Sequence, residues 1–154
     1  MELGTILAPG AIRPSVHVAS KKRLLQTVSD LAGEVYGLDP ATTAEALCER
    51  ESLGPTGVGR GVALPHARMD GMMGVSGAFL RLEEPIEFGA VDRRPVDLVF
   101  ALFAPAGSGV EHLKALAAVS RVMRNREICA KLRANTDPRV LHAILVESRI
   151  DQAA

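Results

Sequence analysis

Apolar side chains recur at helical spacing in several stretches of the chain, most clearly between Ser20 and Gly37. The repeating positions, separated by four, three and four residues, are Leu24, Val28, Leu31 and Val35. This pattern predicts one face of an amphipathic helix. Ser20 is a favoured N-cap residue and Gly37 a favoured residue after the last turn, so we expect the helix to occupy 21–36.

Four further helices are predicted by caps and periodicity. Asp39-Pro40 opens a helix that runs to about Glu51, because Asp caps a first turn and Pro fits its first position. Its expected inner face consists of Ala44, Leu47 and Cys48. The segment 108–111 (SGVE) matches a capping box before a helix to Met123. Shorter helices are expected at 127–134 and after Asp137-Pro138, the last with an apolar face of Val140, Leu141, Ile144 and Leu145.

Strands are expected at 16–19, 62–64 and 75–82, with a short strand and turn in 86–95. The segment 54–61 is glycine-rich and predicts a loop. The run VDLVFALFA at 96–104 is almost entirely apolar, which indicates a central strand covered on both faces. Helices interleaved with strands, without an internal repeat, predict a single α/β domain over 1–154. About ten N-terminal and five C-terminal residues are expected to be flexible.

Charge and composition narrow the classes of function. The 18 basic and 18 acidic residues balance, and no basic block is present, so nucleic acid is not an expected partner. The start of the chain lacks a signal-peptide pattern and no apolar run could span a bilayer, which favours a cytoplasmic protein without membrane insertion. Cys48 and Cys129 lie outside any metal or disulfide pattern and are each expected to be buried. We expect neither a metal nor a cofactor.

The strongest candidate for chemistry is the segment TGVGRGVALPHAR, from Thr56 to Arg68. Glycine allows the backbone to approach an anion closely, and Pro65 restricts the residue before it, so the direction of the His66 imidazole would be fixed. The predicted phosphate-binding loop consists of Thr56, Gly57, Gly59 and Gly61. His66 itself is a candidate metal ligand, general base, nucleophile or inert turn residue. His17 and His142 are interpreted as surface or half-buried residues.

The spacing within this segment does not choose between a phosphate site and a tight turn. It lacks the Lys-Ser/Thr of a Walker loop, the spacing of a dinucleotide fingerprint and the serine elbow of a hydrolase. Arg50, at a helix end, offers a guanidinium that can grip phosphate oxygens. His112 lies in the first turn of a helix, where an anion is favoured. Together with His66 these two residues suggest a phosphate-handling set.

Three segments then resemble the fructose/mannitol-type enzyme IIA domains of the bacterial phosphoenolpyruvate-dependent phosphotransferase system. They are RESLGPTGVGRGVALPHAR at 50–68, PVDLVFALFAP at 95–105 and EHLKALAAVSRVMRN at 111–125. The length of the chain is most similar to the stand-alone nitrogen-regulatory branch. The resemblance implies one mixed, mostly parallel sheet of about five strands with helices on both faces.

The resemblance also implies a role for each candidate residue. His66 would accept a phosphoryl group on Nε2 from a phosphorylated HPr-like carrier, while Arg50 and His112 stabilise that group. The predicted docking residues are Val58, Arg60, Val62 and Leu64, with Met69, Met72 and Met73 either joining them or filling the core. Arg60 and the DRRP segment at 92–95 depart from the family pattern, and we interpret Arg60 as solvated.

Three functions remain open on the sequence. The first is a regulatory phosphocarrier whose phosphorylation controls its binding to unidentified target proteins. The second is a sugar-transport component that passes the phosphoryl group to a IIB domain. The third is an interaction module that keeps the fold but is not phosphorylated, which a buried or blocked His66 would favour.

Overall fold

The computed structural model describes residues 1–107 and 109–148, and within them six strands form one mixed sheet. The strands are β1 (Leu7–Val16), β2 (Gly57–Gly59), β3 (Val62–Ala63), β4 (His66–Met69), β5 (Ser76–Ile86) and β6 (Val96–Pro105). Their order is β1-β5-β6-β3-β2, and β4 also pairs with β6. The pairs β1/β5, β3/β6 and β4/β6 are parallel, whereas β5/β6 and β2/β3 are antiparallel. The predicted mixed, mostly parallel sheet is confirmed.

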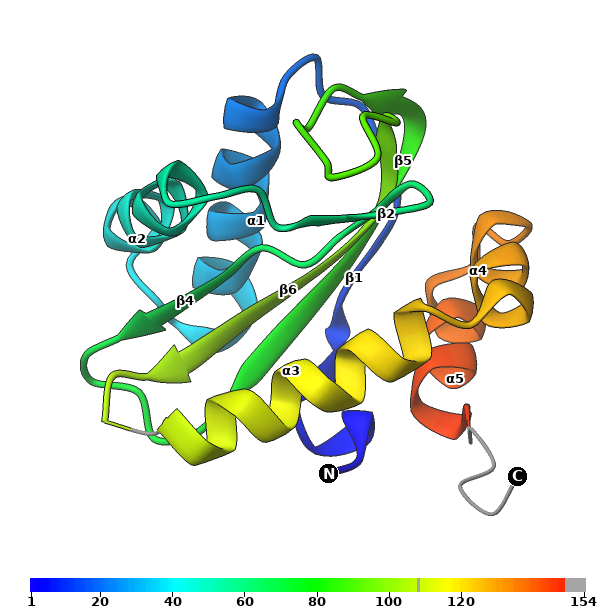
Figure 1. The fold of residues 1–154 in the computed structure, drawn as a ribbon. Coiled ribbons are helices and arrows are strands. Elements are labelled where there is room, and N and C mark those ends of the chain that lie inside the picture. Colours follow the sequence, from blue (N-terminus) through cyan, green and yellow to red (C-terminus); the bar gives the residue numbers. More distant parts are fainter. Residues whose placement is uncertain (108, 149–154) are drawn as a thin grey trace.

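Helices cover both faces of this sheet, as expected (Figure 1). The helices are α1 (Lys21–Tyr36), α2 (Pro40–Ser52), α3 (Gly109–Met123), α4 (Arg126–Arg133) and α5 (Pro138–Glu147), preceded by a 3-10 turn, η1 (Leu3–Thr5). The pair α1 and α2 lies on one face, and α3, α4 and α5 lie on the other. The fold is therefore a single α/β sandwich in the described residues.

Local capping explains where most helices begin. The side chains of Ser20, Asp39, Asn125 and Asp137 each accept a hydrogen bond from a backbone N–H of the following turn. Gly37 ends α1 in the left-handed conformation, with φ of 72°. These caps confirm the predicted boundaries to within a residue or two. The predicted capping box begins at Ser108, which lies outside the described residues.

The central strand β6 forms the core of the sandwich. Val96 and every residue from Leu98 to Ala104 are almost completely buried, so side chains on both faces of the strand are covered. This confirms the expectation from its unbroken apolar sequence. Leu141 and Leu145 of α5 are buried as predicted, whereas Val140, predicted for the same apolar face, is 39% exposed.

Three local expectations were wrong. The N-terminal residues expected to be flexible form η1 and the start of β1, with Leu3 and Leu7 buried, and β1 ends at Val16 instead of beginning there. Prolines within β1 obscure the strand pattern but are tolerated because β1 lies at the edge of the sheet. Cys48 is exposed because α2 buries Thr43 and Leu47 instead, whereas Cys129 is buried as predicted. The predicted C-terminal flexibility concerns 149–154, outside the described residues.

Strand β1 departs from regular pairing with β5 near its start, and a tyrosine hydroxyl compensates for the gap. The register changes between the pairs Leu7/Gly77 and Ile12/Phe79. In this gap the Tyr36 hydroxyl accepts a hydrogen bond from the backbone N–H of Ala8 at 3.0 Å and donates one to the carbonyl of Gly77 at 2.6 Å. The last turn of α1 is thereby fixed to both strands.

We predict that Tyr36→Phe lowers the free energy of unfolding by about 1–2 kcal/mol, because the Ala8 N–H and Gly77 carbonyl lose their partner in a partly buried position. Urea unfolding followed by circular dichroism measures the change. Thr27→Val is a suitable control, since it removes an exposed helix hydroxyl that bonds the carbonyl of Arg23. An effect of Tyr36→Phe no larger than that of the control would contradict the bridging role.

Candidate functional site

Pro65 divides the segment that pairs with β6 into two short strands. Residues 62–63 pair with one part of β6 and residues 66–69 pair with a later part. Proline has no N–H to donate, so the ladder is interrupted between them. At this break the N–H of Leu64 turns to the Thr56 carbonyl at 2.9 Å, and the Pro65 carbonyl accepts the N–H of Leu102 at 2.9 Å. Because the Thr56 N–H bonds to Glu51 and not to Leu64, the carbonyl of Leu64 is available to a side chain.

That carbonyl determines the protonation of His66. The imidazole Nδ1 lies 2.8 Å from the Leu64 carbonyl oxygen, which can only accept, so Nδ1 carries the proton. In the neutral ring Nε2 is then left with a lone pair. The guanidinium Nε of Arg50 donates to this Nε2 at 3.2 Å. His66 therefore presents a nucleophilic nitrogen to a fixed cation.

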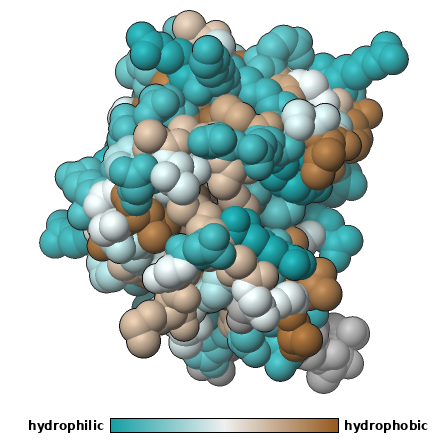
Figure 2. All heavy atoms as spheres, turned by 90° about the vertical axis from the view of Figure 1, so that its left-hand side faces the viewer, coloured by the Kyte–Doolittle hydropathy of each residue, from teal (hydrophilic) through white to brown (hydrophobic). Residues whose placement is uncertain are grey.

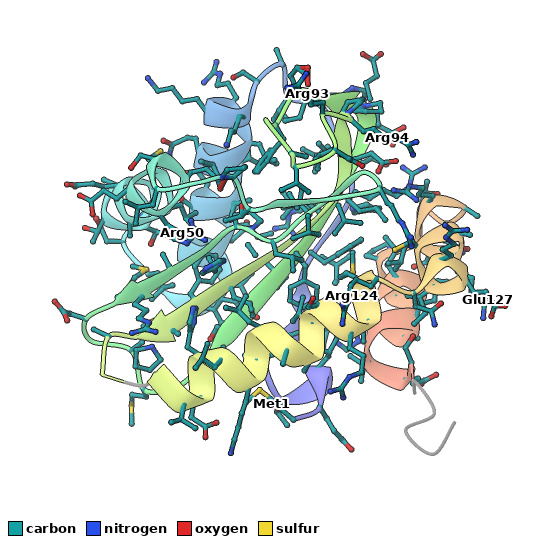
Figure 3. All side chains as sticks on the ribbon, in the orientation of Figure 1. Met1, Arg50, Arg93, Arg94, Arg124 and Glu127 are labelled. Atoms are coloured by element: carbon teal, nitrogen blue, oxygen red, sulfur yellow. The ribbon has the colours of Figure 1, made fainter. Side chains whose placement is uncertain are left out.

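Arg50 is held from the last turn of α2 by a second contact. Its Nη1 donates to the carbonyl of Gly54 at 3.1 Å, just beyond the helix. Figure 3 places Arg50 between α2 and the sheet, whereas Arg93 and Arg94 lie at the upper end of the view. The sequence prediction that Arg50 and His66 lie together agrees with this geometry.

The adjacent residue, Glu51, fixes the loop that connects α2 to the site. Its carboxylate accepts hydrogen bonds from the Thr56 N–H at 2.6 Å and the Thr56 hydroxyl at 2.5 Å. The same carboxylate forms an ion pair with Lys21 at 3.1 Å, and its side chain is only 6% exposed. Lys21 also lies over the ring of Phe88, 4.4 Å from its centroid. A buried carboxylate paired in this way fixes its partners in position.

His112 of α3 lies beside His66 and is deeply buried. The two ring centroids are 5.3 Å apart, and His112 is only 4% exposed. Its Nδ1 has no hydrogen-bond partner among residues 1–107 and 109–148. Burial lowers the pKa of His112 to about 4, with smaller contributions from the charges of His66 and Arg68. His112 is therefore neutral near pH 7.

Burial also lowers the pKa of His66 below its usual value of 6.5, and the charge of Arg50 acts in the same direction. The hydrogen bond to Leu64 and the charge of Glu51 act against this shift without reversing it. A lowered pKa keeps the Nε2 lone pair available at neutral pH.

Two hollows open on this group of residues. One, of about 630 Å³, is lined by residues that include Arg50, His66, Arg68 and His112. The other, of about 350 Å³, lies among residues that include Arg50, Thr56, Val58, His66 and Leu116. A larger depression of about 770 Å³ between α4 and α5 is lined by none of the candidate residues. His66 is half-buried and reachable from both smaller hollows.

The predicted phosphate-binding loop is only partly brought to this site. Thr56 lines the smaller hollow, but its N–H and hydroxyl are occupied by Glu51. Gly57 packs so tightly against Ala90 that a Cβ would lie 2.7 Å from that side chain. Gly59 and Gly61 have φ of 103° and 79° and lie against Asp92 and Arg133 instead. These two glycines permit the turn between β2 and β3. Their predicted place in the phosphate-binding loop is therefore corrected.

The predicted docking residues divide in the same way. Val62 and Leu64 are only 1% and 5% exposed because they enter the core beside β6, although Leu64 also lines the smaller hollow. Val58 is 44% exposed and lines the smaller hollow. Arg60 is exposed at the hairpin turn with φ of 57°, where Asp92 accepts its backbone N–H at 2.8 Å. Of the three methionines, Met69 is buried in the core, Met72 is half-buried and Met73 is fully exposed.

Three exposed apolar residues that belong to the turn after α2, which lines the larger of the two hollows, or to the first turns of α3, close in sequence to His112, were not predicted from the sequence. They are Leu53 of the turn after α2, and Val110 and Leu113 of α3. Figure 2 faces the side of the molecule that carries α2 and shows apolar side chains in separate groups among hydrophilic ones. Arg68 was missed as well, because β4 was not predicted. A strand beginning at His66 would have placed both side chains on one face.

Neither a metal site nor a membrane span is found in the part of the chain that the structure describes. No three His, Cys, Asp or Glu side chains there are grouped so that they could hold a metal ion. None of its helices has the length and apolar character needed to cross a bilayer.

Comparisons with known proteins agree with this geometry. The family described as "Phosphoenolpyruvate-dependent sugar phosphotransferase system, EIIA 2" matches residues 5–148. A "Nitrogen regulatory protein" of Bradyrhizobium diazoefficiens is 43% identical over 145 residues, which cover 94% of this chain and 95% of that protein. A "PTS system fructose-specific EIIA component" of Haloferax volcanii is 35% identical over 130 residues, or 84% of each chain.

A solved structure gives the same result. The crystal structure of "Nitrogen Regulatory Protein IIA-Ntr" from Neisseria meningitidis superposes with a TM-score of 0.87 at 37% identity, covering 92% of this chain and 97% of that one. The chain therefore belongs to the EIIA 2 family of the phosphoenolpyruvate-dependent sugar phosphotransferase system.

Proposed function

We propose that this protein is a regulatory histidine phosphocarrier, in which His66 Nε2 accepts a phosphoryl group from a phosphorylated HPr-like protein. The observation that carries the proposal is the fixed tautomer of His66: Nδ1–H is bound to Leu64, and the Nε2 lone pair faces Arg50. His66 is neither buried completely nor blocked, which argues against a module that is never phosphorylated.

The transfer needs little from the protein beyond position and charge. The phosphorus–nitrogen bond of the donor breaks, its electron pair returns to the donor imidazole, and a phosphorus–nitrogen bond forms to His66 Nε2. Arg50 then moves its hydrogen bond from Nε2 to a phosphoryl oxygen. The Nδ1 proton stays with the Leu64 carbonyl, so the phosphorylated ring keeps its orientation. His112 remains beside the group as a neutral ring in a position shielded from water.

A regulatory role is favoured by the relatives. The matching proteins of B. diazoefficiens and N. meningitidis are named for nitrogen regulation, and each aligns over more than nine-tenths of its length. We infer that phosphorylation of His66 changes the surface that a target protein binds. The fructose-specific relative supports the second candidate, in which the group passes to a IIB domain.

Exposed apolar residues that line the hollows or lie on the first turns of α3 form the proposed docking surface for the carrier. We define this surface as Leu53, Val58, Val110 and Leu113. Exposed apolar groups next to a reactive histidine suit a small, transient interface. Arg60 is left outside the docking surface because its turn lies against Asp92.

The phosphoryl acceptor is tested first. When the protein is incubated with labelled phosphoenolpyruvate, the general enzyme and the carrier, we expect His66→Ala to remain unlabelled and His17→Ala to be labelled like the wild type. His17 is exposed and is not among the residues that line the two hollows. Label that persists in His66→Ala would exclude this residue as acceptor.

The acceptor of the second transfer distinguishes regulation from transport. The labelled protein is mixed with purified IIB domains, and we expect its label to persist. Rapid loss of label to a sugar-specific IIB domain would support the transport role and contradict a purely regulatory one.

The rate of acceptance should depend on the pKa of His66. Protonation removes the lone pair of Nε2, so the rate of phosphoryl acceptance falls as the pH drops below the pKa of His66 in the folded protein. The expected fall is about tenfold per pH unit. Because burial lowers this pKa, we expect the midpoint below 6.5. NMR titration of the His66 ring and transfer rates from phosphorylated carrier measure it. A midpoint at or above 6.5 would contradict the proposed environment.

If the docking surface binds the carrier, a substitution there should weaken carrier binding without preventing phosphorylation of His66. We expect Leu113→Ser to raise the KM for the phosphorylated carrier by roughly fivefold, because the 62% exposed side chain would lose its apolar contact. The final extent of labelling should not change. Val140→Ser on α5 is a matched control with no expected effect. Equal KM values for both variants would exclude Leu113 from the interface.

A further inference from the structure

Arg68 lies at the site without a partner in the described structure. It follows His66 by two residues in β4, and alternation along a strand places both side chains on the same face of the sheet. Arg68 is exposed, and no hydrogen bond or ion pair joins its guanidinium to the residues at 1–107 or 109–148. It lines the same hollow as Arg50, His66 and His112.

The guanidinium is directed toward the start of α3. A Cβ placed on Gly109 would lie 3.9 Å from Nη2 of Arg68 and 4.0 Å from its Nη1. His112 follows three residues later on the same helix. The positive charge of Arg68 lies near enough to lower the pKa of both His66 and His112. Arg68 therefore contributes to the electrostatic environment of both rings.

The unphosphorylated site carries positive charge that the described residues around it leave uncompensated. Arg50 and Arg68 are cations beside two neutral imidazoles, and the Glu51 carboxylate is engaged by Thr56 and Lys21. Glu49 also lines the hollow, but no ion pair links it to Arg68 in the described part of the chain. A group with close to two negative charges fits such a site.

We propose that Arg68 binds the phosphoryl group on His66 together with Arg50, so that phosphorylation provides the partner its guanidinium lacks. The inference rests on the proposed function of His66. Arginine binds phosphoryl oxygens with a planar fork of N–H donors, so two arginines from different elements can hold the group from two directions. Binding would also draw an exposed cation inward and neutralise it, which changes the surface that a target protein meets.

The test compares Arg68→Gln and Arg68→Lys with the wild type. The quantity measured is the equilibrium constant for phosphoryl transfer from the phosphorylated carrier to this protein, because it depends on the stability of the product and not on docking. We expect Arg68→Gln to lower this constant by about tenfold, as for loss of one charge-assisted hydrogen bond at a partly exposed site. Arg68→Lys should lower it less, because the charge remains but the fork is lost.

Arg139→Gln on α5 is the matched control, since its side chain is 91% exposed and remote from the hollows. We expect it to leave the constant unchanged. A second measurement is the rise in melting temperature on phosphorylation, which should be smaller for Arg68→Gln than for the control. Without phosphate the two variants should melt like the wild type, because no hydrogen bond to Arg68 is lost from the described structure.

The outcomes separate this inference from the proposed function. If the wild type accepts no phosphoryl group, the proposed function itself fails. If the wild type is labelled and Arg68→Gln has an unchanged equilibrium constant, Arg68 does not bind the group. Slower transfer with an unchanged constant would place Arg68 in carrier docking, and a lower melting temperature without phosphate would indicate a structural role. Each of these results would overturn the inference.

Discussion

The site depends on one interruption of strand pairing. Pro65 cannot donate to the ladder, so β3 and β4 pair separately with β6 and leave the Leu64 carbonyl at the break. That carbonyl accepts the Nδ1–H of His66 and directs the Nε2 lone pair toward Arg50. The reactive nitrogen is thus selected by backbone geometry. The Leu64 N–H bonds to the Thr56 carbonyl while the Thr56 N–H bonds to Glu51, so the Leu64 carbonyl is left to accept from His66.

The second constraint is the balance of burial and charge around the histidines. Burial lowers the pKa of both rings, which favours neutral imidazoles at the place where the proposed phosphoryl group would bind. The positive charge comes instead from guanidinium groups, which stay ionised in such surroundings. Glu51 is the nearby buried carboxylate, and its contacts with Thr56 and Lys21 use its charge to fix the loop.

Much of the fold was predicted because its signals are local. The caps at Ser20, Asp39 and Asp137 and the apolar run of β6 each depend on neighbouring residues. Strand β4 was missed because four residues after a proline carry too short a pattern. The burial of Val62 and Leu64 was missed for a related reason, since only pairing with β6 reveals which side of the glycine-rich segment enters the core.

The sequence by itself determined the helices, the buried central strand and the residues proposed for phosphate chemistry, His66, Arg50 and His112. Periodicity, capping and residue type act over a few positions and can be read along the chain. Only the tertiary structure decided the tautomer of His66, the burial of His112 and the position of Arg68 beside them. These properties arise from contacts between segments distant in sequence, where burial and the field of neighbouring charges are set by packing.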